Sequence, residues 1–375
     1  MTSLSPFAKI TRTTLLKAVL SLVVCALALS LSANASSIVK FNAPGAGTGS
    51  GEGTVPLAIN SSGILAGYYI DSNSAYHGFA RLANGTISTI DAPGAGTLAG
   101  EGTYAYSINT SGVIAGFYID SNGAYHGYVR AANGKFATFQ AVTGDSTLAA
   151  NINDSGVVAG YYVDTNGVYH GFVRTASGTI TSFDAPGAGT GSGEGTLAGG
   201  VDCINSSGAI VGNYLDSNSV YHGYVRTASG TFTTYDAPGA GTGSGQGTEP
   251  SGINDTGTIT GVIIDTNSAY HGFVRSTSGT FTAFNAKGAG TASGEGTEAE
   301  NINKSGAIVG QYIDTNGVNH GFERAPSGTI ETGNVPGAGT ASGQGTIPSS
   351  NGPTNLIDGE FIDASGVAHG FLFTP

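Results

Sequence analysis

One short stretch, Tyr118 to Tyr128, recurs with small changes along the whole chain of 375 residues. It joins a Tyr-x-Asp segment to Tyr-His-Gly-Tyr. All seven histidines of the protein occupy the histidine position of this stretch: His77, His126, His170, His222, His271, His320 and His369. Successive histidines are 44 to 52 residues apart. A period of roughly 20 to 50 residues is typical of solenoids, propellers and other arrays, so the chain is a seven-fold repeat.

Each repeat predicts four short β-strands. In the repeat that runs from Leu148 to Pro186, segments rich in β-branched and aromatic residues alternate with Asp-Ser-Gly, Asp-Thr-Asn-Gly and Ala-Ser-Gly turns. Such turns are typical of hairpins, because Asn and Asp bond their own backbone and Gly adopts positive φ. The four segments are 148–153, 157–163, 169–174 and 179–183. Without helical periodicity of useful length, each repeat predicts a four-stranded antiparallel meander.

The two ends of the chain predict how these meanders stack. The last repeat stops after its third segment at Pro375, whereas the chain after residue 35 opens with the missing fourth segment, Ser37 to Pro44. We therefore expect an all-β fold, a seven-bladed β-propeller of four-stranded antiparallel blades, in which the N-terminal strand closes the last blade and removes exposed sheet edges. A linear β-solenoid and a string of small β domains are the alternatives, and neither explains the out-of-phase start.

Residues 1–35 are typical of a secretory signal peptide. Lys9, Arg12 and Lys17 precede an apolar run, and small residues before Ala35 favour cleavage after it. A retained membrane anchor is the alternative. We expect residues 36–375 to form a single propeller domain that is secreted, extracellular or periplasmic. Only Cys203 then remains, so no internal disulfide can form and a small buried side chain is its simplest interpretation.

The charge balance restricts the partners. Residues 36–375 carry 10 Lys and Arg against 25 Asp and Glu, and such an acidic surface repels phosphate backbones. We therefore exclude nucleic acid as a partner, and no later segment is apolar enough to span a membrane. We expect a monomer whose partner is an extracellular glycan or protein.

The repeats resemble the bacterial extracellular repeats of the HAF family, named after a His-Ala-Phe signature. The resemblance rests on Ile-Asn-x-Ser-Gly-x-x-x-Gly-x-Tyr-x-Asp, as in Ile108 to Asp120, followed by Tyr-His-Gly-Phe; here Gly, as in His77-Gly78-Phe79, replaces the signature Ala. The match covers all seven repeats, and the last repeat departs from it at Asn351 to Asn355. The resemblance implies a secreted repeat protein and no particular activity.

Each histidine follows an aspartate by six residues, which suggests either a structural pair or a reactive group. A residue needed once per repeat most simply satisfies the hairpin that carries it, whereas one active site needs a unique constellation. The aspartates are Asp71, Asp120, Asp164, Asp216, Asp265, Asp314 and Asp363. We therefore interpret these pairs as structural and predict no catalytic residue, no metal site and no cofactor; calcium at the Asp-Ser-Asn-Gly turn is a weak alternative.

Arginines also stand at a fixed place, four residues after six of the histidines, as in Arg81, Arg174 and Arg226. We expect each to pair with a carboxylate or a carbonyl, and Asp91, Asp184 and Asp236 on the following strand are possible partners.

The long Gly-rich connections between repeats are the predicted functional surface, because binding residues usually lie on loops that a rigid scaffold holds. They carry a rim of acidic and amide side chains that could bind hydroxyl-rich ligands or cations: Glu52, Glu101, Glu194, Gln246, Glu295 and Gln344. The alternative is a solvated acidic rim. The absence of a predicted helix and of Lys-Ser/Thr after the glycines argues against a phosphate site.

Three functions remain open from the sequence. Near-identical repeats favour a non-catalytic exported protein that binds a multivalent polysaccharide or surface protein through this loop face, since equivalent weak sites gain avidity. A carbohydrate-active hydrolase with one axial pocket would need a repeat with unique carboxylates. The irregular places are Asp145, Asp202-Cys203, and Asp358 with Glu360, and none forms an evident acid and base pair. A structural envelope or matrix protein is the third possibility.

Overall fold

The structure, a computed structural model, describes residues 36–200, 202–352 and 355–375. The predicted signal peptide lies outside these residues. Residues Ile38–Thr374 form one compact unit. Every regular element that the structure describes is a β-strand, which confirms the all-β prediction for this part of the chain.

The strands follow the repeat. The first complete repeat holds β2 (Gly53–Ile59), β3 (Leu65–Ile70), β4 (Tyr76–Arg81) and β5 (Ile87–Ile90). The next ones hold β6 (Gly102–Ile108), β7 (Ile114–Ile119), β8 (Tyr125–Arg130), β9 (Phe136–Phe139), β10 (Ser146–Ile152), β11 (Val158–Val163), β12 (Tyr169–Arg174) and β13 (Ile180–Phe183). Then follow β14 (Gly195–Leu197), β15 (Ile210–Leu215), β16 (Tyr221–Arg226), β17 (Phe232–Tyr235), β18 (Gly247–Ile253), β19 (Ile259–Ile264), β20 (Tyr270–Arg275) and β21 (Phe281–Phe284). The last are β22 (Gly296–Ile302), β23 (Ile308–Ile313), β24 (Asn319–Arg324), β25 (Ile330–Gly333), β26 (Gly345–Asn351), β27 (Ile357–Ile362) and β28 (Ala368–Thr374), and β1 (Ser37–Phe41) precedes them all.

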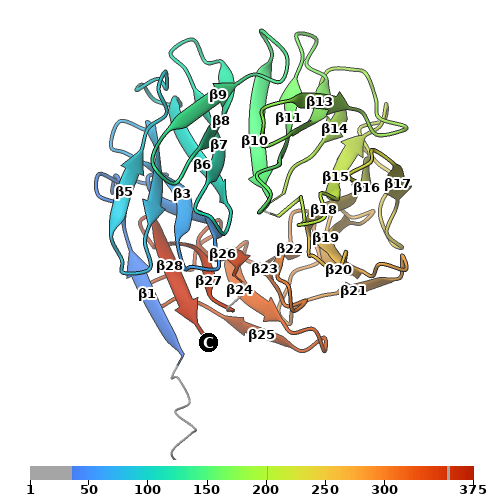
Figure 1. Cartoon of the computed structure of the whole chain (residues 1–375). Coiled ribbons are helices and arrows are strands. Elements are labelled where there is room, and N and C mark those ends of the chain that lie inside the picture. The colour runs from blue at the N-terminus through green and yellow to red at the C-terminus, as the bar shows by residue number, and fades with distance from the viewer. Residues whose placement is uncertain (1–35, 201, 353–354) are drawn as a thin grey trace, which may run out of the picture. The chain divides into compact units, whose positions relative to one another are not determined.

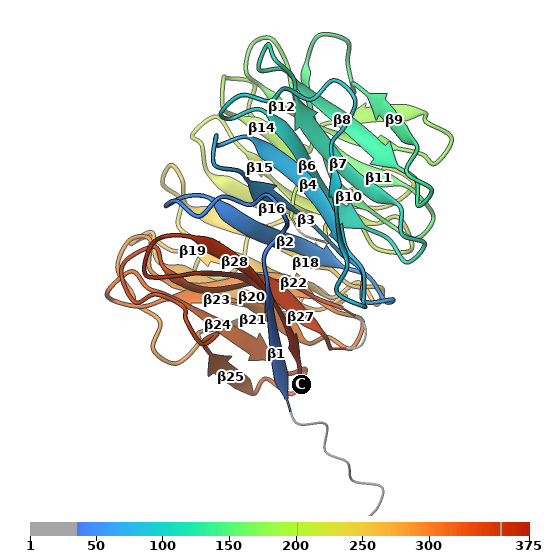
Figure 2. The ribbon, with the colours of Figure 1, turned by 90° about the vertical axis from the view of Figure 1, so that its left-hand side faces the viewer.

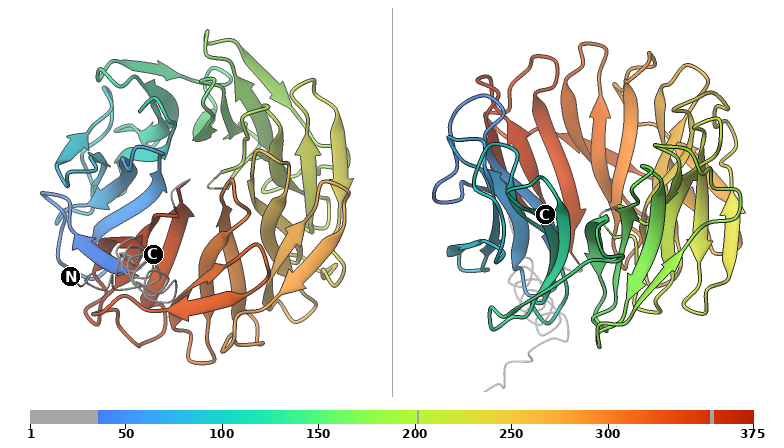
Figure 3. Two further views of the ribbon diagram at one scale, coloured as in Figure 1. Left: turned by 60° about the horizontal axis from the view of Figure 1, so that its bottom comes forward. Right: turned by 90° about the horizontal axis from the view of Figure 1, so that it is seen from above.

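Consecutive strands pair antiparallel in groups of four, each of which we call a blade and name by its first strand. In the β10 blade, for example, β10 pairs with β11, β11 with β12, and β12 with β13. The first strands of neighbouring blades contact one another, as β2 contacts β6 and β18 contacts β22. Figure 1 shows them around a central opening, and Figure 3 shows the same arrangement from two other directions. The fold is a β-propeller.

Most neighbouring blades are joined by a parallel bridge between the third strand of one blade and the first strand of the next, and among the described strands only β8 and β10 lack it. Tyr76 of β4 bridges Gly102 of β6, and the Tyr76 amide donates to the Glu101 carbonyl at 2.8 Å. A Cβ on Gly102, whose φ is 124°, would lie 1.9 Å from the Tyr76 carbonyl oxygen. The Gly-Thr pair that opens every first strand except β10, which begins with Ser146-Thr147, therefore needs its glycine at this junction.

The last blade is completed by the start of the chain. β26, β27 and β28 pair in order, and β1 pairs with β28. Figure 2 shows β1 beside β28, although the two strands lie at opposite ends of the chain. The Lys40 ammonium also donates to the Pro336 carbonyl at 3.0 Å. This pairing of the chain ends is the one that the sequence predicts.

An aromatic side chain on the fourth strand holds each of several blades against the next blade. Phe183 lies over Gly171 of its own β10 blade, where a Cβ would come within 2.3 Å of the Phe183 ring. Phe183 also meets the edge of Tyr224 in the β14 blade at 6.4 Å between ring centroids. The glycine of the His-Gly-Phe signature is therefore required where such a ring covers it.

The arginines of the third strands stack on these rings. The Arg226 guanidinium lies 4.6 Å from the Phe183 ring centroid, and Arg81 lies 4.7 Å from that of Phe41. The expected pairing of Asp91, Asp184 and Asp236 with the arginines is wrong, because all three carboxylates pair with histidines. A carbonyl partner exists, since Arg226 donates to Thr227 O at 3.3 Å. The arginines thus stabilise blade contacts mainly through cation–π stacking.

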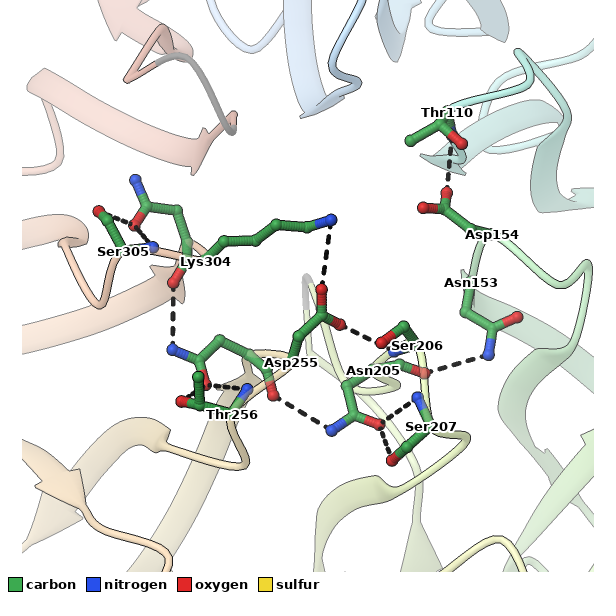
Figure 4. A network of polar contacts seen from close by, with 12 residues as sticks. Thr110, Asn153, Asp154, Asn205, Ser206, Ser207, Asp255, Thr256, Lys304 and Ser305 are labelled. Carbon is green, nitrogen blue, oxygen red and sulfur yellow. Dashed lines mark hydrogen bonds and ion pairs between the residues drawn. The ribbon is translucent and has the colours of Figure 1, made fainter.

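Asparagines at the ends of the first strands link the blades on the opposite face from the Gly-rich connections. Each side-chain oxygen caps its own turn, and the side-chain nitrogens of five of these asparagines donate to the backbone carbonyl of the next asparagine at 3.0–3.2 Å. The sixth, Asn303, donates to the side-chain oxygen of Asn355 at 3.1 Å. We call this set the asparagine belt: Asn60, Asn109, Asn153, Asn205, Asn254 and Asn303. Figure 4 shows part of the belt, with Asp255 accepting from the Ser206 amide and pairing with Lys304 at 3.2 Å.

Candidate functional site

Two positions on the first strands differ from blade to blade although the residues around them hardly change. They lie one and three residues after a buried threonine whose hydroxyl accepts from an earlier backbone amide. This amide is eleven residues earlier, as Thr103 accepts from Ala92 at 2.9 Å, except in the shortened β10 repeat, where it is six residues earlier. The pairs are Val55 and Leu57, Tyr104 and Tyr106, Leu148 and Ala150, Leu197 and Gly199, Glu249 and Ser251, Glu298 and Glu300, and Ile347 and Ser349. Most are only half-buried, although the strand lies deep in the blade.

A β-bulge directs the second position of these pairs. The register of β6 with β7 shifts between Ala105 and Ser107, and that of β22 with β23 shifts between Ala299 and Asn301. Tyr106 and Glu300 are the residues that the two bulges leave unpaired. Bulges re-aim side chains beside binding sites, and here they present residues toward the central opening.

Acidic side chains gather at one side of this opening. Glu249, Glu298 and Glu300 line a cavity of about 420 Å³ together with Tyr221 and Tyr270. Gln311 donates a hydrogen bond to Glu298. We call this space the axial cavity. No lysine or arginine is among the residues that line it, so its carboxyl groups would favour a ligand with hydroxyl or amine donors.

The surroundings of these carboxyl groups weaken their acidity. Burial raises the pKa of Glu300 to about 7, and the charges of Glu298 and Glu249 act in the same direction. Burial and Glu298 raise the pKa of Glu249 to about 7. Burial also raises the pKa of Glu360, on β27, to about 7. Near neutral pH the site therefore holds both protonated carboxyls, which donate a hydrogen bond, and carboxylates, which accept.

A second group of aromatic side chains gathers in the β2 and β6 blades, away from the residues that line the axial cavity. Tyr104 stacks on Tyr76 and on Phe117 with 4.6 Å between ring centroids, and Tyr68 lies 4.8 Å from Tyr104. Together with Tyr106 we call these residues the aromatic wall. Burial, followed by the charge of Glu300, raises the pKa of Tyr106. Tyr106 and Glu300 come from β6 and β22, which Figure 1 shows on opposite sides of the central opening.

The irregular repeat at Asp202-Cys203 also reaches the axis. Asp202 forms a parallel bridge with Gly252 of the β18 blade and accepts from the Asn301 side chain of the β22 blade at 2.7 Å. Burial raises its pKa, while hydrogen bonds from Asn301 and Asn151 oppose the shift. Cys203 is fully buried and free. The insertion thus ties distant blades together, and it does not present a reactive thiol.

The other irregular acids have separate surroundings. Asp358 is fully buried on β27 at a place where the β2, β6 and β10 blades have alanine, and Ser350 donates a hydrogen bond to it. Burial raises the pKa of Asp358 to about 7. Asp145 belongs to the shortened connection before β10, where its amide donates to the Val142 carbonyl at 3.2 Å. Only Glu360 of this group stands near the aromatic wall, since its charge contributes to the raised pKa of Tyr68 after burial.

The predicted rim side chains all bind their own connections. Glu52 accepts from the Gly49 amide at 2.6 Å, Glu194 from Gly191 at 2.7 Å, and Gln246 from Gly243 at 3.0 Å. Glu101, Glu295 and Gln344 make the same contact with Leu98, Ala292 and Ala341. One oxygen of each side chain therefore stabilises its loop, and ligand binding by the rim stays a prediction.

The repeated histidines and aspartates lie at the bases of the hairpins. Asp164 accepts from the amides of Asn166 and Val168 at 2.8 and 2.9 Å, and these backbone hydrogen bonds, Val168 first, hold its pKa below the usual value. His170 Nδ1 lies 2.8 Å from Asp184 Oδ1, and its ring stacks on Tyr162 at 4.9 Å. His369 connects in the same way to Asn42 at 2.9 Å, across the joined chain ends. The seven pairs lie apart, each in its own repeat.

The described part of the chain lacks a metal-binding group of side chains and a membrane-spanning helix. It contains no group of three His, Cys, Asp or Glu side chains arranged to hold a metal ion. Its residues also form no helix with the length and apolar character of a membrane span.

Sequence reasoning missed the axial cavity. Glu249, Glu298 and Glu300 lie one or three residues after the Gly-Thr pair of their repeats, at positions that the four-strand pattern does not specify. A usable signal was present: where repeats are almost identical, the few positions that differ are where a unique site can form. Comparing the seven repeats column by column would have isolated them.

Comparisons with known proteins concern the fold alone. No family model matches the chain, and no curated protein matches it either. A prolyl endopeptidase structure is similar over 90% of this chain and 50% of its own, with a TM-score of 0.50 and 10% identity. A puromycin hydrolase (TM-score 0.47, 11% identity, 84% of this chain and 53% of its own) and the lectin BP39L from Burkholderia pseudomallei (0.47, 10%, 84% and 97%) are less similar. The chain spans about half the length of the two hydrolases.

Proposed function

We propose that this protein is an exported, glycan-binding β-propeller of seven four-stranded blades, with its ligand site in the axial cavity. Seven blades are supported by the position of the seven repeated histidines, which fall on β4, β8, β12, β16, β20, β24 and β28. β1, from the start of the chain, is the fourth strand of the last blade. Export rests on the predicted signal peptide.

The observation that carries the proposal is the grouping of carboxyl and aromatic side chains at the variable positions of the first strands. The variable positions bring carboxyl groups into the axial cavity, which Tyr221 and Tyr270 also line, and they bring stacked aromatic rings to the β6 blade, in a scaffold whose other positions repeat. A sugar ring has an apolar C–H face, which packs on aromatic rings, and hydroxyls around its edge, which hydrogen-bond to carboxyl groups. Concave sites with aromatic walls and a few convergent polar groups are typical of ligand pockets.

The rim predicted from the sequence is a weaker candidate. Each of its side chains already uses an oxygen to hold its own Gly-rich connection, so ligand binding there would compete with loop structure. We therefore place the ligand on the axis and keep multivalent binding by the loop face as a separate prediction.

Calorimetric titration with a panel of neutral and amino-sugar oligosaccharides tests the proposal. Glu300→Gln should weaken binding by roughly tenfold or more, because a hydrogen bond to a charged group contributes about 1.5–3 kcal/mol. Glu52→Gln is the matched control, since glutamine stands at the equivalent place in two other connections, and it should bind as the wild type does. Loss of binding in the rim variant alone, or no binding of any glycan, would contradict the proposal.

Glycan hydrolysis is a second candidate, favoured by one specific observation. Glu249 and Glu300 share the axial cavity and both have a pKa raised to about 7, which is the range of a general acid in glycosidases. Chromatography of oligosaccharides after incubation with the protein distinguishes the two functions. New products that disappear with Glu300→Gln, while binding remains, would identify an enzyme.

A further inference from the structure

The contact between the β22 and β26 blades differs from the other blade contacts. In most other contacts an aromatic ring on the fourth strand fills the space between a blade and its successor, and in the contact between the β2 and β6 blades Ile90 takes this place. Phe139 packs on Phe172 at 5.9 Å, Phe284 on Phe322 at 6.0 Å, and Phe41 on Phe79 at 6.3 Å between ring centroids. The corresponding residue of β25 is Gly333.

The missing ring leaves an apolar cavity. A Cβ on Gly333 would meet no atom within 4 Å. The cavity has a volume of about 180 Å³, and its lining includes Phe322, Val335, Pro348, Phe371 and Phe373. We call it the Gly333 slot. An apolar cavity of roughly 150 Å³ is large enough for a benzene molecule, so the slot has room for one aromatic ring.

The same slot carries two carboxylates that no other blade has at these places. Glu323 and Glu331 face each other across β24 and β25, and both line the slot. The β10 blade has Val173 and Thr181 there. Burial, and then the charge of Glu331, raises the pKa of Glu323. Like charges directly opposite in a sheet repel, and in the described chain neither glutamate belongs to an ion pair. A cation at the slot would relieve this repulsion.

The stacked cation of the other contacts is also absent. Arg226 and Arg324 lie over Phe183 and Phe284 at 4.6 and 5.0 Å, whereas the equivalent residue of β28 is Phe373. The slot thus lacks both the ring and the guanidinium of its sister contacts. It offers aromatic side chains and carboxylates in their place.

We propose that the Gly333 slot binds a partner polypeptide that inserts one phenylalanine or tyrosine side chain next to a lysine or arginine. The ring takes the place that Phe41, Phe139, Phe183, Tyr235 and Phe284 take in the sister contacts, and the basic side chain meets Glu323 and Glu331. A second copy of this chain does not fit, because the large apolar side chains exposed in its described part are aliphatic: Ile38, Val39, Leu82, Leu98 and Val142.

The test uses capped tetrapeptides as probes. Saturation-transfer NMR on the purified protein compares Gly-Phe-Lys-Gly with Gly-Ala-Lys-Gly, which lacks the ring, and Gly-Phe-Glu-Gly, which reverses the charge. We expect the first to bind at least roughly tenfold more tightly than either comparator. Equal binding of all three, or of none, would overturn the proposal.

Two variants locate the site. Gly333→Phe restores the sister residue, so it should raise the melting temperature and abolish peptide binding, and retained binding would overturn the proposal. The double variant Glu323→Val with Glu331→Thr copies the β10 blade and should remove the preference for Lys over Glu while the ring requirement remains. Gly333→Ala is the control and should bind like the wild type. Self-association in sedimentation that Gly333→Phe removes would assign the slot to a second copy instead.

Discussion

Substitution of Asn205 tests whether the asparagine belt stabilises the propeller. Its side chain is 6% exposed. The oxygen accepts from the Ser207 amide at 3.1 Å, the Ser207 hydroxyl at 2.7 Å and the Ala209 amide at 3.0 Å. The nitrogen donates to the Asn254 carbonyl at 3.1 Å, in the next blade. One side chain therefore holds both its own turn and a neighbouring blade.

The expected loss of unfolding free energy depends on which of these groups lose their hydrogen-bond partners. In Asn205→Ala, water can replace the side chain at exposed Ser207. The Ala209 amide and the Asn254 carbonyl are less accessible, and an unsatisfied buried group costs about 1–3 kcal/mol. We expect the free energy of unfolding to fall by about 2–4 kcal/mol. Asn205→Asp isolates the blade contact, because it keeps the accepting oxygen and replaces only the donor.

The assay is urea unfolding followed by far-ultraviolet circular dichroism and tyrosine fluorescence, since the chain has no tryptophan. The carboxyl introduced by Asn205→Asp should have a raised pKa beside the Asn254 carbonyl. The loss of unfolding free energy that Asn205→Asp causes relative to the wild type should therefore be smaller near pH 4, where the protonated carboxyl donates a hydrogen bond, and should grow as the pH rises. Asn84→Asp is the control, because Asn84 only caps its own exposed turn. A loss below about 0.5 kcal/mol in Asn205→Ala would refute the reasoning, since ordinary surface changes reach that size.

Three further outcomes follow from the structure. Deletion of residues 36–44 removes β1 and its pairing with β28, so thermal unfolding should move to a markedly lower temperature, and an unchanged melting curve would rule out closure by β1. The pKa values of Glu249, Glu300 and Glu360 are raised to about 7, so the native state binds more protons than the unfolded state between about pH 4.5 and 7. The contribution of these three groups to the free energy of unfolding therefore declines as the pH rises through this window. In unfolding measured as a function of pH, Glu300→Gln should make this decline less steep. Burial raises the pKa of Cys203 to about 12, so a disulfide thiol reagent at pH 8 should react only after denaturant is added, and rapid reaction of the native protein would contradict this burial.

Much of the fold could be read from the residues because it is local and repeated. Period-two apolar segments and turns such as Asp164-Thr165-Asn166-Gly167 specify hairpins through neighbouring residues. The incomplete last repeat and the out-of-phase start likewise indicated the partner of β1 without any knowledge of distances. These features depend on short stretches of chain, and repetition makes each of them visible several times.

The candidate site could not be predicted in the same way, because it depends on which residues from distant blades share the axis. Glu300 and Tyr106 are about 200 residues apart, and only the bulges and the curvature of the sheet bring them to one opening. The pKa values of the carboxyl groups likewise depend on burial by other blades. The Gly333 slot exists only because a neighbouring blade creates a space that its own fourth strand does not fill.

By itself, the sequence determined the four-strand repeat, the turns and the joining of the chain ends, since these follow from local periodicity and from the order of segments. The tertiary structure alone decided that Asn205 bonds the next blade, that Arg226 stacks on Phe183 instead of pairing with Asp236, and that Glu249, Glu298 and Glu300 line one cavity. The physical reason is that these interactions join residues one or more blades apart, where side-chain direction and burial depend on how the sheets pack.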